Sequence, residues 1–141
     1  MLGAPDEVWV GIDPGTVRCG VASSDPSLTL ASPLGVVQTE PHATLGSRIV
    51  QLLGPRSPIN LVIGLPLDQR GREGDSARLA RELGALIGSA LGLEPEYIDE
   101  RFTTRETTLR QREAGRKQKQ IAQHVDAHAA AAILQSALDR R

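Results

Sequence analysis

A chain of 141 residues, 40% of them apolar, is long enough to fold around one core, and we expect a single domain over residues 1–141. The single cysteine, Cys19, excludes an internal disulfide. We expect a soluble, cytoplasmic protein, because the sequence shows neither a basic-then-apolar leader nor an apolar run long enough to cross a membrane. A net charge of −1 does not by itself indicate a nucleic-acid-binding protein.

Basic residues are concentrated in one window of the chain. Residues 101–120 carry seven arginines and lysines against two glutamates, a net charge of +5 that leaves −6 for the rest. A basic segment beside an acidic remainder is expected where one edge of a protein meets phosphates and another holds cations. A solvated helix face and loop would give the same pattern. The residues that we expect to contact substrate phosphates are Arg18, Arg101, Arg116, Lys117 and Lys119.

The amino-terminal part of the chain favours three short strands. Apolar runs predict them at 7–13, 18–24 and 32–39, close enough in sequence to pair as an antiparallel meander. Pro14 and Gly15 separate the first two runs and are typical of a turn. The first two strands should therefore form a hairpin, with Asp13 near the end of its first strand.

The remainder of the chain alternates helices with strands. Helical spacing of apolar residues predicts helices at 41–54 and 75–91, and a continuous apolar run at 59–65 predicts a buried strand. A short strand at 96–99 follows, and the last third is helical, at about 103–113 and 119–139. Strands that alternate with helices are joined by parallel crossovers. We expect an α/β fold whose mixed sheet has three antiparallel and then two parallel strands, with helices on both faces.

Three acids stand at the ends of predicted elements. Asp13 ends the first strand, Glu100 closes the last strand, and Asp126 opens the last helix ahead of an alanine-rich stretch. We expect the first and last strands to lie side by side, so that their carboxylates converge, and the small-sided helix to bring Asp126 in from above. Gathered carboxylates repel one another unless a hard divalent cation binds them. Two such cations about 4 Å apart are a known arrangement for phosphodiester hydrolysis.

The same residues also have ordinary structural explanations. Asp13 precedes Pro14 and Gly15 and could cap their turn, and an acid at a helix N-terminus, as predicted for Asp126, stabilises the helix dipole. Arg101 could pair with a neighbouring acid and only shape the site. His128, close to Asp126, is more simply a spectator than a proton-transfer group. Spacing alone leaves these alternatives open.

Four sequence blocks together resemble one protein family. They are residues 11–25 (GIDPGTVRCGVASSD), residues 62–67 (VIGLPL, with Gly71 and Gly74 downstream), residues 99–104 (DERFTT) and residues 125–130 (VDAHAA). In this order, and spread over nearly the whole chain, they resemble the YqgF/RuvX family. Its members are described as Holliday junction resolvases and as nucleases that mature pre-16S ribosomal RNA.

The resemblance implies a ribonuclease H-like fold, also seen in the RuvC resolvases, and a nuclease that depends on Mg²⁺ or Mn²⁺. It assigns Asp13, Glu100 and Asp126 as the catalytic acids and metal ligands, with Asp13 shared by two cations. Hydrolysis would leave a 5′-phosphate and a 3′-hydroxyl. The implied partner is nucleic acid, either an RNA precursor or branched DNA. Symmetric resolution of a four-way junction favours a homodimer, and RNA processing favours a monomer.

The chain departs from the family pattern at two positions that bear on these expectations. The family usually has a lysine where this chain has Val17, which affects a possible phosphate contact. RuvC-type enzymes carry a further acid where this chain has Gln123, which affects the second cation site. The loop at 67–74 follows a predicted buried strand, and we expect it to face the substrate, without assigning Asp68 as a metal ligand.

Two other function classes share part of the pattern. Sugar kinases and actin-like ATPases open on a similar turn, where glycine and threonine approach a nucleotide phosphate, but they need a second lobe for which 141 residues leave no room. A non-catalytic scaffold that binds nucleic acid or protein is the other alternative, and a metal-binding titration would distinguish it from a nuclease.

Overall fold

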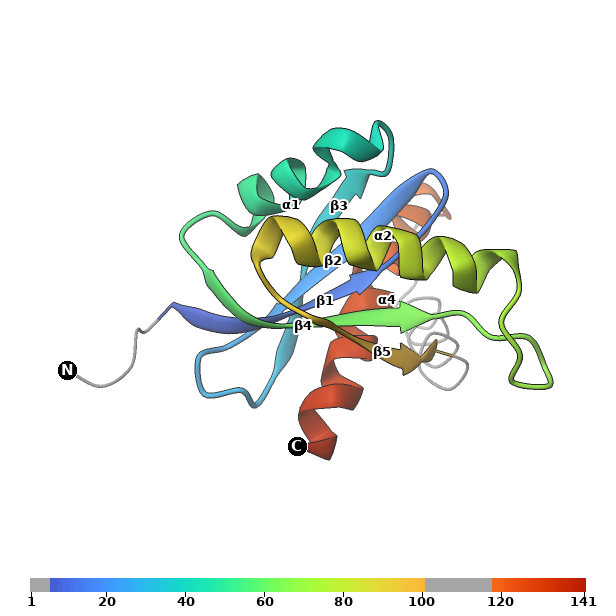
Figure 1. Ribbon diagram of the computed structural model, residues 1–141. Helices are drawn as coiled ribbons and strands as arrows, with labels where there is room; N and C mark the ends of the chain where they lie inside the picture. Colours follow the sequence, from blue (N-terminus) through green and yellow to red (C-terminus); the bar gives the residue numbers. More distant parts are fainter. Residues whose placement is uncertain (1–5, 101–117) are drawn as a thin grey trace.

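The computed structural model describes residues 6–100 and 118–141, with the side chains of the last helix described from residue 127 onward. Its centre is a five-stranded mixed sheet in the order β3-β2-β1-β4-β5 (Figure 1). Within the described residues no helix combines the length and the apolar character needed to cross a membrane. The predicted helix at 103–113 lies outside the described residues.

The first three strands form the predicted antiparallel meander. They are β1 (Glu7–Asp13), β2 (Arg18–Ser24) and β3 (Ala31–Gln38). Asp13 lies opposite Gly20 in β2, and Arg18 lies opposite Gln38 in β3. The hairpin therefore brings the end of β1 and the start of β2 to the same end of the sheet, where the carboxyl end of β1 lies.

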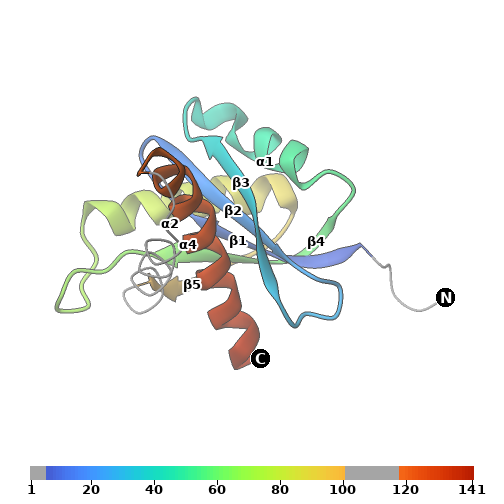
Figure 2. The ribbon, with the colours of Figure 1, turned by 180° about the vertical axis from the view of Figure 1, so that it is seen from behind.

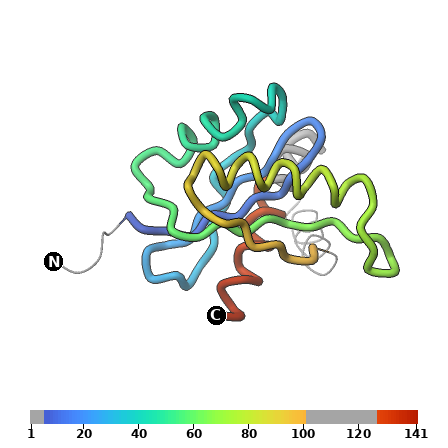
Figure 3. Tube along the Cα trace, viewed as in Figure 1, coloured from blue at the N-terminus to red at the C-terminus, as the bar shows by residue number. Residues whose placement is uncertain are grey.

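Two further strands extend the sheet beyond β1, and two helices precede and connect them. A 3₁₀ turn (His42–Thr44) leads into α1 (Leu45–Leu53), and α2 (Asp75–Leu91) connects β4 (Ser57–Leu65) to β5 (Pro95–Asp99). β4 pairs in parallel with β1, and β5 pairs in parallel with β4. The carboxyl ends of β1, β4 and β5 consequently point to the same side, which the trace also shows (Figures 1 and 3).

The prediction that the first and last strands lie side by side was wrong, because β4 separates β1 from β5. A strand has only two edges. One edge of β1 pairs with its hairpin partner β2, and the other pairs with β4, the first strand to return in parallel. Neither edge of β1 is left for β5, which pairs instead with the remaining edge of β4.

Helices cover both faces of the sheet, as predicted. α1 and α2 lie on one face, and α4 (Gln118–Arg140) crosses the other (Figure 2). Side chains alternate along each strand, so Val10 and Ile12 of β1 pack with Ile49 and Leu83 on the α1/α2 face. The intervening positions of β1, Gly11 and Asp13, face α4.

The fit of α4 onto the sheet depends on small residues. A Cβ added at Gly11 would lie 2.7 Å from Leu134 Cβ and 2.9 Å from the Ala130 carbonyl oxygen. Ile133 and Leu134 are fully buried in a second core with Val62 and Ala22. The glycine in β1 therefore allows close contact between helix and sheet at the edge where Asp13 lies.

The helix also corrects the predicted position of Asp126. α4 begins at Gln118, so Asp126 lies inside the helix and does not open it. The predicted helix range of 119–139 agrees with α4, and that range already places Asp126 inside the helix, so only its assignment to the helix start was wrong. An acid two turns into a helix is not at the N-terminus, where the helix dipole would stabilise it. That structural explanation of Asp126 is excluded.

Candidate active site

Two of the three predicted acids meet at the carboxyl edge of the parallel strands. Asp13 is the last residue of β1, and Glu100 directly follows β5. Their side chains are hydrogen-bonded to each other. Glu100 is half-buried, and its Oε2 atom is fully buried. The convergence predicted from the sequence is present, although the two strands are not neighbours.

The contact between the two acids crosses β4 at Gly64. The register of β4 aligns Gly64 with Ile98 in β5, and the preceding residue, Ile63, with Ile12 in β1. Gly64 thus lies between the end of β1 and the residues that lead to Glu100. A Cβ at this position would overlap Glu100 Oε2 and would lie 2.5 Å from Ile133 Cδ1. Because Gly64 has no side chain, the Glu100 carboxylate can extend over β4 to Asp13.

Burial is the main influence on the charge of Glu100. It raises the pKa of the Glu100 carboxyl by penalising the charged form; the hydrogen bond with Asp13 lowers this pKa, and the negative charge of Asp99 raises it. A hydrogen bond between two carboxyl groups requires a proton on one of them. The pair therefore holds a proton more tightly than a solvated glutamate would, which partly relieves the repulsion between the two acids.

The donor set fits a hard divalent cation. Mg²⁺, Mn²⁺ and Ca²⁺ prefer carboxylate oxygens, and a cation in place of the shared proton would neutralise both acids at once. Among the side chains that the structure describes, no group of three potential metal ligands occurs. The side chain of Asp126 is outside this part of the chain. Its backbone lies in α4 one turn before Ala130, whose carbonyl oxygen approaches Gly11.

Comparison with known proteins shows the family of the chain. A family model described as "RuvX: Holliday junction resolvase" matches residues 7–140. The chain belongs to the RuvX family. The match spans the sheet, the acid pair and α4, and it argues against an actin-like ATPase lobe.

Relatives of this RuvX-family chain are similar over nearly its whole length. It is 39% identical over 133 residues to a protein of Anaeromyxobacter sp. (strain Fw109-5), with 94% of this chain and 97% of the relative covered. It is 40% identical over 133 residues to a protein of Mycobacterium ulcerans (strain Agy99), with 94% and 78% covered. Both relatives carry the name "Putative pre-16S rRNA nuclease".

A solved structure supports the fold. RuvC of T. thermophilus, in complex with a Holliday junction substrate, matches with a TM-score of 0.55 and 21% sequence identity, over 96% of this chain and 95% of that chain. This likeness confirms the predicted ribonuclease H-like fold.

The turn after Asp13 is held by a residue that the sequence reasoning missed. Thr39, directly after β3, is fully buried. Its hydroxyl donates to the Gly15 carbonyl oxygen at 2.6 Å, and its backbone N–H donates to the Val17 carbonyl oxygen at 3.0 Å. Cys19 Sγ lies 3.4 Å from the same hydroxyl, and burial raises the pKa of its thiol. Thr39 therefore fixes the turn between Asp13 and Arg18, and nothing in its local sequence indicated this contact.

The structure describes the side chain of only one of the five predicted phosphate-binding residues, Arg18. Arg18 begins β2, two positions before Gly20, the partner of Asp13, so it lies at the same edge and on the α4 face. Arg101, Arg116 and Lys117 lie outside the described residues, and Lys119 lies in α4 with its side chain outside them. For all five residues, Arg18 included, the role in phosphate binding stays a prediction. His128 is half-buried in α4.

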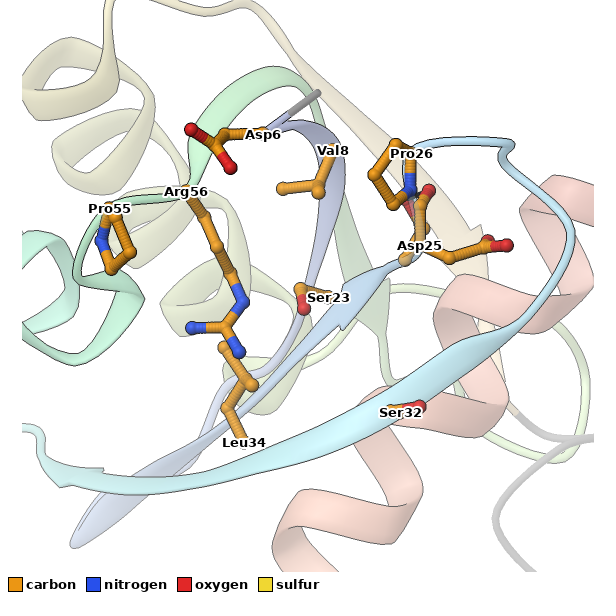
Figure 4. Close-up of a pocket in the computed structure, with 10 residues that line it drawn as sticks. Asp6, Val8, Ser23, Asp25, Pro26, Ser32, Leu34, Pro55 and Arg56 are labelled. Atoms are coloured by element: carbon orange, nitrogen blue, oxygen red, sulfur yellow. Dashed lines mark hydrogen bonds between the residues drawn. The ribbon is translucent and has the colours of Figure 1, made fainter. Parts of the chain in front are cut away.

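A groove of about 590 Å³ lies at the opposite end of the strands, where β1 begins and β2 ends (Figure 4). Val8 lies between Arg56 on one side and Asp25 on the other. The Arg56 guanidinium donates to the Leu53 carbonyl oxygen at 3.0 Å, at the end of α1. Asp25 accepts hydrogen bonds from the backbone of Leu30 and Thr29 and from Ser27, which lower its pKa to about 2. These polar groups organise their own loops, and the groove is separate from the acid pair.

Proposed function

We propose that this protein is a divalent-metal-dependent nuclease that hydrolyses phosphodiester bonds in the precursor of 16S ribosomal RNA. The observation that carries the proposal is the pair of hydrogen-bonded carboxyls, Asp13 and Glu100, brought together over Gly64 at the carboxyl edge of a ribonuclease H-like sheet. Membership of the RuvX family, and the names of relatives that are 39% and 40% identical, support the choice of reaction and substrate.

Asp13 and Glu100 would hold the cation, Mg²⁺ or Mn²⁺, and Asp126 is proposed as the third ligand. The bound cation would supply Lewis-acid stabilisation of the charge that develops on the phosphate. Asp13 and Glu100 must lose their shared proton before both can act as ligands. Thr39 and Gly64 keep the two carboxylates in place. We propose that Arg18, at the same edge, contacts the substrate backbone and that Arg101, Arg116, Lys117 and Lys119 extend this contact.

A four-way DNA junction is the second candidate substrate. It is favoured by the description of the matching family model and by the fold shared with a RuvC structure solved with a junction. The two substrates imply different assemblies, since a two-fold junction suits a two-fold dimer and RNA processing suits a monomer. We expect the protein to act in the cytoplasm in either case.

The experiment is a side-by-side cleavage assay with Mg²⁺ and with Mn²⁺. One substrate is an RNA that contains the 5′ end of the 16S precursor, and the other is a synthetic four-way DNA junction. Asp13→Asn is the matched inactive control, since it keeps the shape of the side chain and removes the charge. Its thermal unfolding is measured in parallel to establish that it folds.

Each outcome selects one function. RNA cleavage that is lost in Asp13→Asn supports the proposed ribosomal-RNA nuclease. Symmetric nicking of the junction, also lost in the variant, would replace it with a resolvase and predicts a dimer in solution. If the wild-type protein cleaves neither substrate with either cation, the non-catalytic scaffold becomes the better description. Cleavage that persists in Asp13→Asn would exclude the acid pair as the catalytic centre.

A further inference from the structure

The loop between β4 and α2 leaves the sheet at the edge where the acid pair lies. β4 ends at Leu65, opposite Asp99, the residue before Glu100. Figure 1 shows the loop projecting beyond the carboxyl ends of β4 and β5. A nucleic acid bound at Asp13 and Glu100 would therefore pass on the side of the molecule to which this loop extends.

The tip of the loop is fixed by hydrogen bonds to Asp68. Oδ1 of Asp68 accepts the backbone N–H groups of Arg70 and Arg72, both at 2.8 Å. The backbone N–H of Asp68 donates to the Arg72 carbonyl oxygen at 2.9 Å, and Gly71 N–H donates to the Asp68 carbonyl oxygen at 2.9 Å. Gly71 has φ +79°, in the left-handed region that favours glycine. The segment from Asp68 to Arg72 is a closed turn with little backbone freedom.

The base of the loop is anchored to α2 and β5. Leu67 and Glu73 form a bridge across it. Glu73 accepts hydrogen bonds from Arg81 Nε at 2.8 Å and from Arg81 Nη2 at 2.7 Å, and this contact lowers the pKa of Glu73. The Arg81 guanidinium in turn lies over the ring of Tyr97, 4.7 Å from its centroid. Both ends of the loop are thereby attached to regular structure.

The charged side chains of the loop divide into paired ones and a single exception. Arg72 Nε lies 3.1 Å from Asp68 Oδ2, and Glu73 is paired with Arg81. Arg70, at the exposed tip, takes part in none of the ion pairs between described residues. The loop therefore presents one uncompensated guanidinium on a rigid support.

We propose that Arg70 binds a backbone phosphate of the nucleic-acid substrate and sets the path of the strand across the active-site edge. The inference rests on the proposed nuclease function and adds a substrate contact to it. A guanidinium binds phosphate through two parallel hydrogen bonds, and a prearranged loop loses little entropy when it does so. The loop contains no aromatic residue to stack on a base, so the contact is to phosphate and carries no sequence preference.

The test measures equilibrium binding by the full-length chain in an Asp13→Asn background, so that the substrate is not consumed. The probes are the precursor RNA and the four-way junction described above, each titrated at several salt concentrations. Arg70→Ala is compared with Arg70→Lys and with Arg140→Ala. Arg140 is exposed in the last turn of α4, so its removal changes the net charge equally without touching the loop. Thermal unfolding of each variant accompanies the titrations.

Arg70→Ala should weaken binding about tenfold and lower the slope of log affinity against log salt by about 1, the values expected for one lost charged phosphate contact. Arg70→Lys should recover most of the affinity, and Arg140→Ala should bind like the background protein. If Arg70→Ala and Arg140→Ala bind alike while the wild-type chain cleaves, the Arg70 contact is excluded and the nuclease function stands. If the background protein binds neither probe and the wild-type chain cleaves neither, the proposed function and the Arg70 contact fail together.

Discussion

The carboxyl groups of Asp13 and Glu100 are hydrogen-bonded although a whole strand separates the strands that carry them. β4 lies between β1 and β5, and it presents Gly64 where Glu100 crosses. The contact between Asp13 and Glu100 thus requires a glycine at position 64, because any side chain there would occupy the space of the Glu100 carboxylate. This relationship makes Gly64 the first target for mutation.

Gly64→Ala should disable the site and destabilise the fold. The added Cβ would overlap Glu100 Oε2 and contact Ile133 Cδ1, so we expect a loss of about 1–3 kcal/mol in the free energy of unfolding, as for other overpacked cores. Cleavage should fall further than the unfolded fraction explains, because Glu100 is displaced. Urea unfolding and a cleavage assay on the same samples measure the two effects.

The control for this variant is Gly46→Ala. Its Cβ would overlap Ala90 in the contact between α1 and α2, on the other face of the sheet. It should lose stability and keep full activity per folded molecule. Equal specific activities in the two alanine variants would show that Gly64 serves packing alone.

Glu100→Gln should separate stability from activity. Because burial raises the pKa of Glu100, the native state keeps a proton that the unfolded state loses above the ordinary glutamate pKa of about 4.3. Stability of the cation-free protein therefore falls as the pH rises from that value through the raised pKa. The glutamine cannot titrate, so the variant should be more stable than the wild type at neutral pH, and inactive.

Thermal unfolding in a chelator between about pH 4 and pH 8, a range that spans the ordinary glutamate pKa, measures this effect. Added Mg²⁺ or Mn²⁺ should raise the melting temperature of the wild type and leave that of Glu100→Gln nearly unchanged, since only the former binds the cation well. Parallel pH profiles of the two proteins would contradict the assigned cause.

Thr39→Val tests the support of the turn after Asp13. Valine keeps the shape of threonine but removes the donor to the Gly15 carbonyl oxygen, and the lost hydrogen bond should cost about 1 kcal/mol of stability. If the turn positions Asp13 and Arg18, the affinity for Mn²⁺ should fall as well, which calorimetric titration measures. Thr39→Ser retains the hydroxyl and should restore that affinity. A stability loss with unchanged Mn²⁺ affinity would limit Thr39 to the fold.

Asp126→Asn tests the third predicted acid. Asp126 lies inside α4, away from the helix N-terminus, so its charge has no capping role and stability should change little. Cleavage should fall by about 100-fold or more. Mutation of a residue that only hydrogen-bonds to a metal ligand already lowers metal affinity or activity by about 10- to 100-fold, and Asp126 is proposed as a ligand itself. Asp139→Asn, the same charge change in an exposed residue near the end of α4, is the matched control. Equal activity in both variants would remove Asp126 from the site.

The sequence by itself determined most of the described elements and indicated the candidate acids. Its apolar runs predicted β1 and β2 at their observed bounds and α2 over its observed length, because apolar periodicity and turn-forming residues such as Pro14 and Gly15 act within a segment. Asp13 and Glu100 could be recognised because Asp13 ends a strand and Glu100 directly follows one, and the family resemblance rested on blocks of adjacent residues.

Only the tertiary structure decided how those elements meet. The insertion of β4 between β1 and β5, the passage over Gly64 and the contact from Thr39 to Gly15 all join residues far apart in the chain. Such contacts depend on which strand edges remain free and on the clearance left after α4 packs against the sheet. The periodicity of apolar residues within a segment reveals neither the free strand edges nor this clearance. The sequence could therefore indicate two converging acids and still misplace the strands that lead to them.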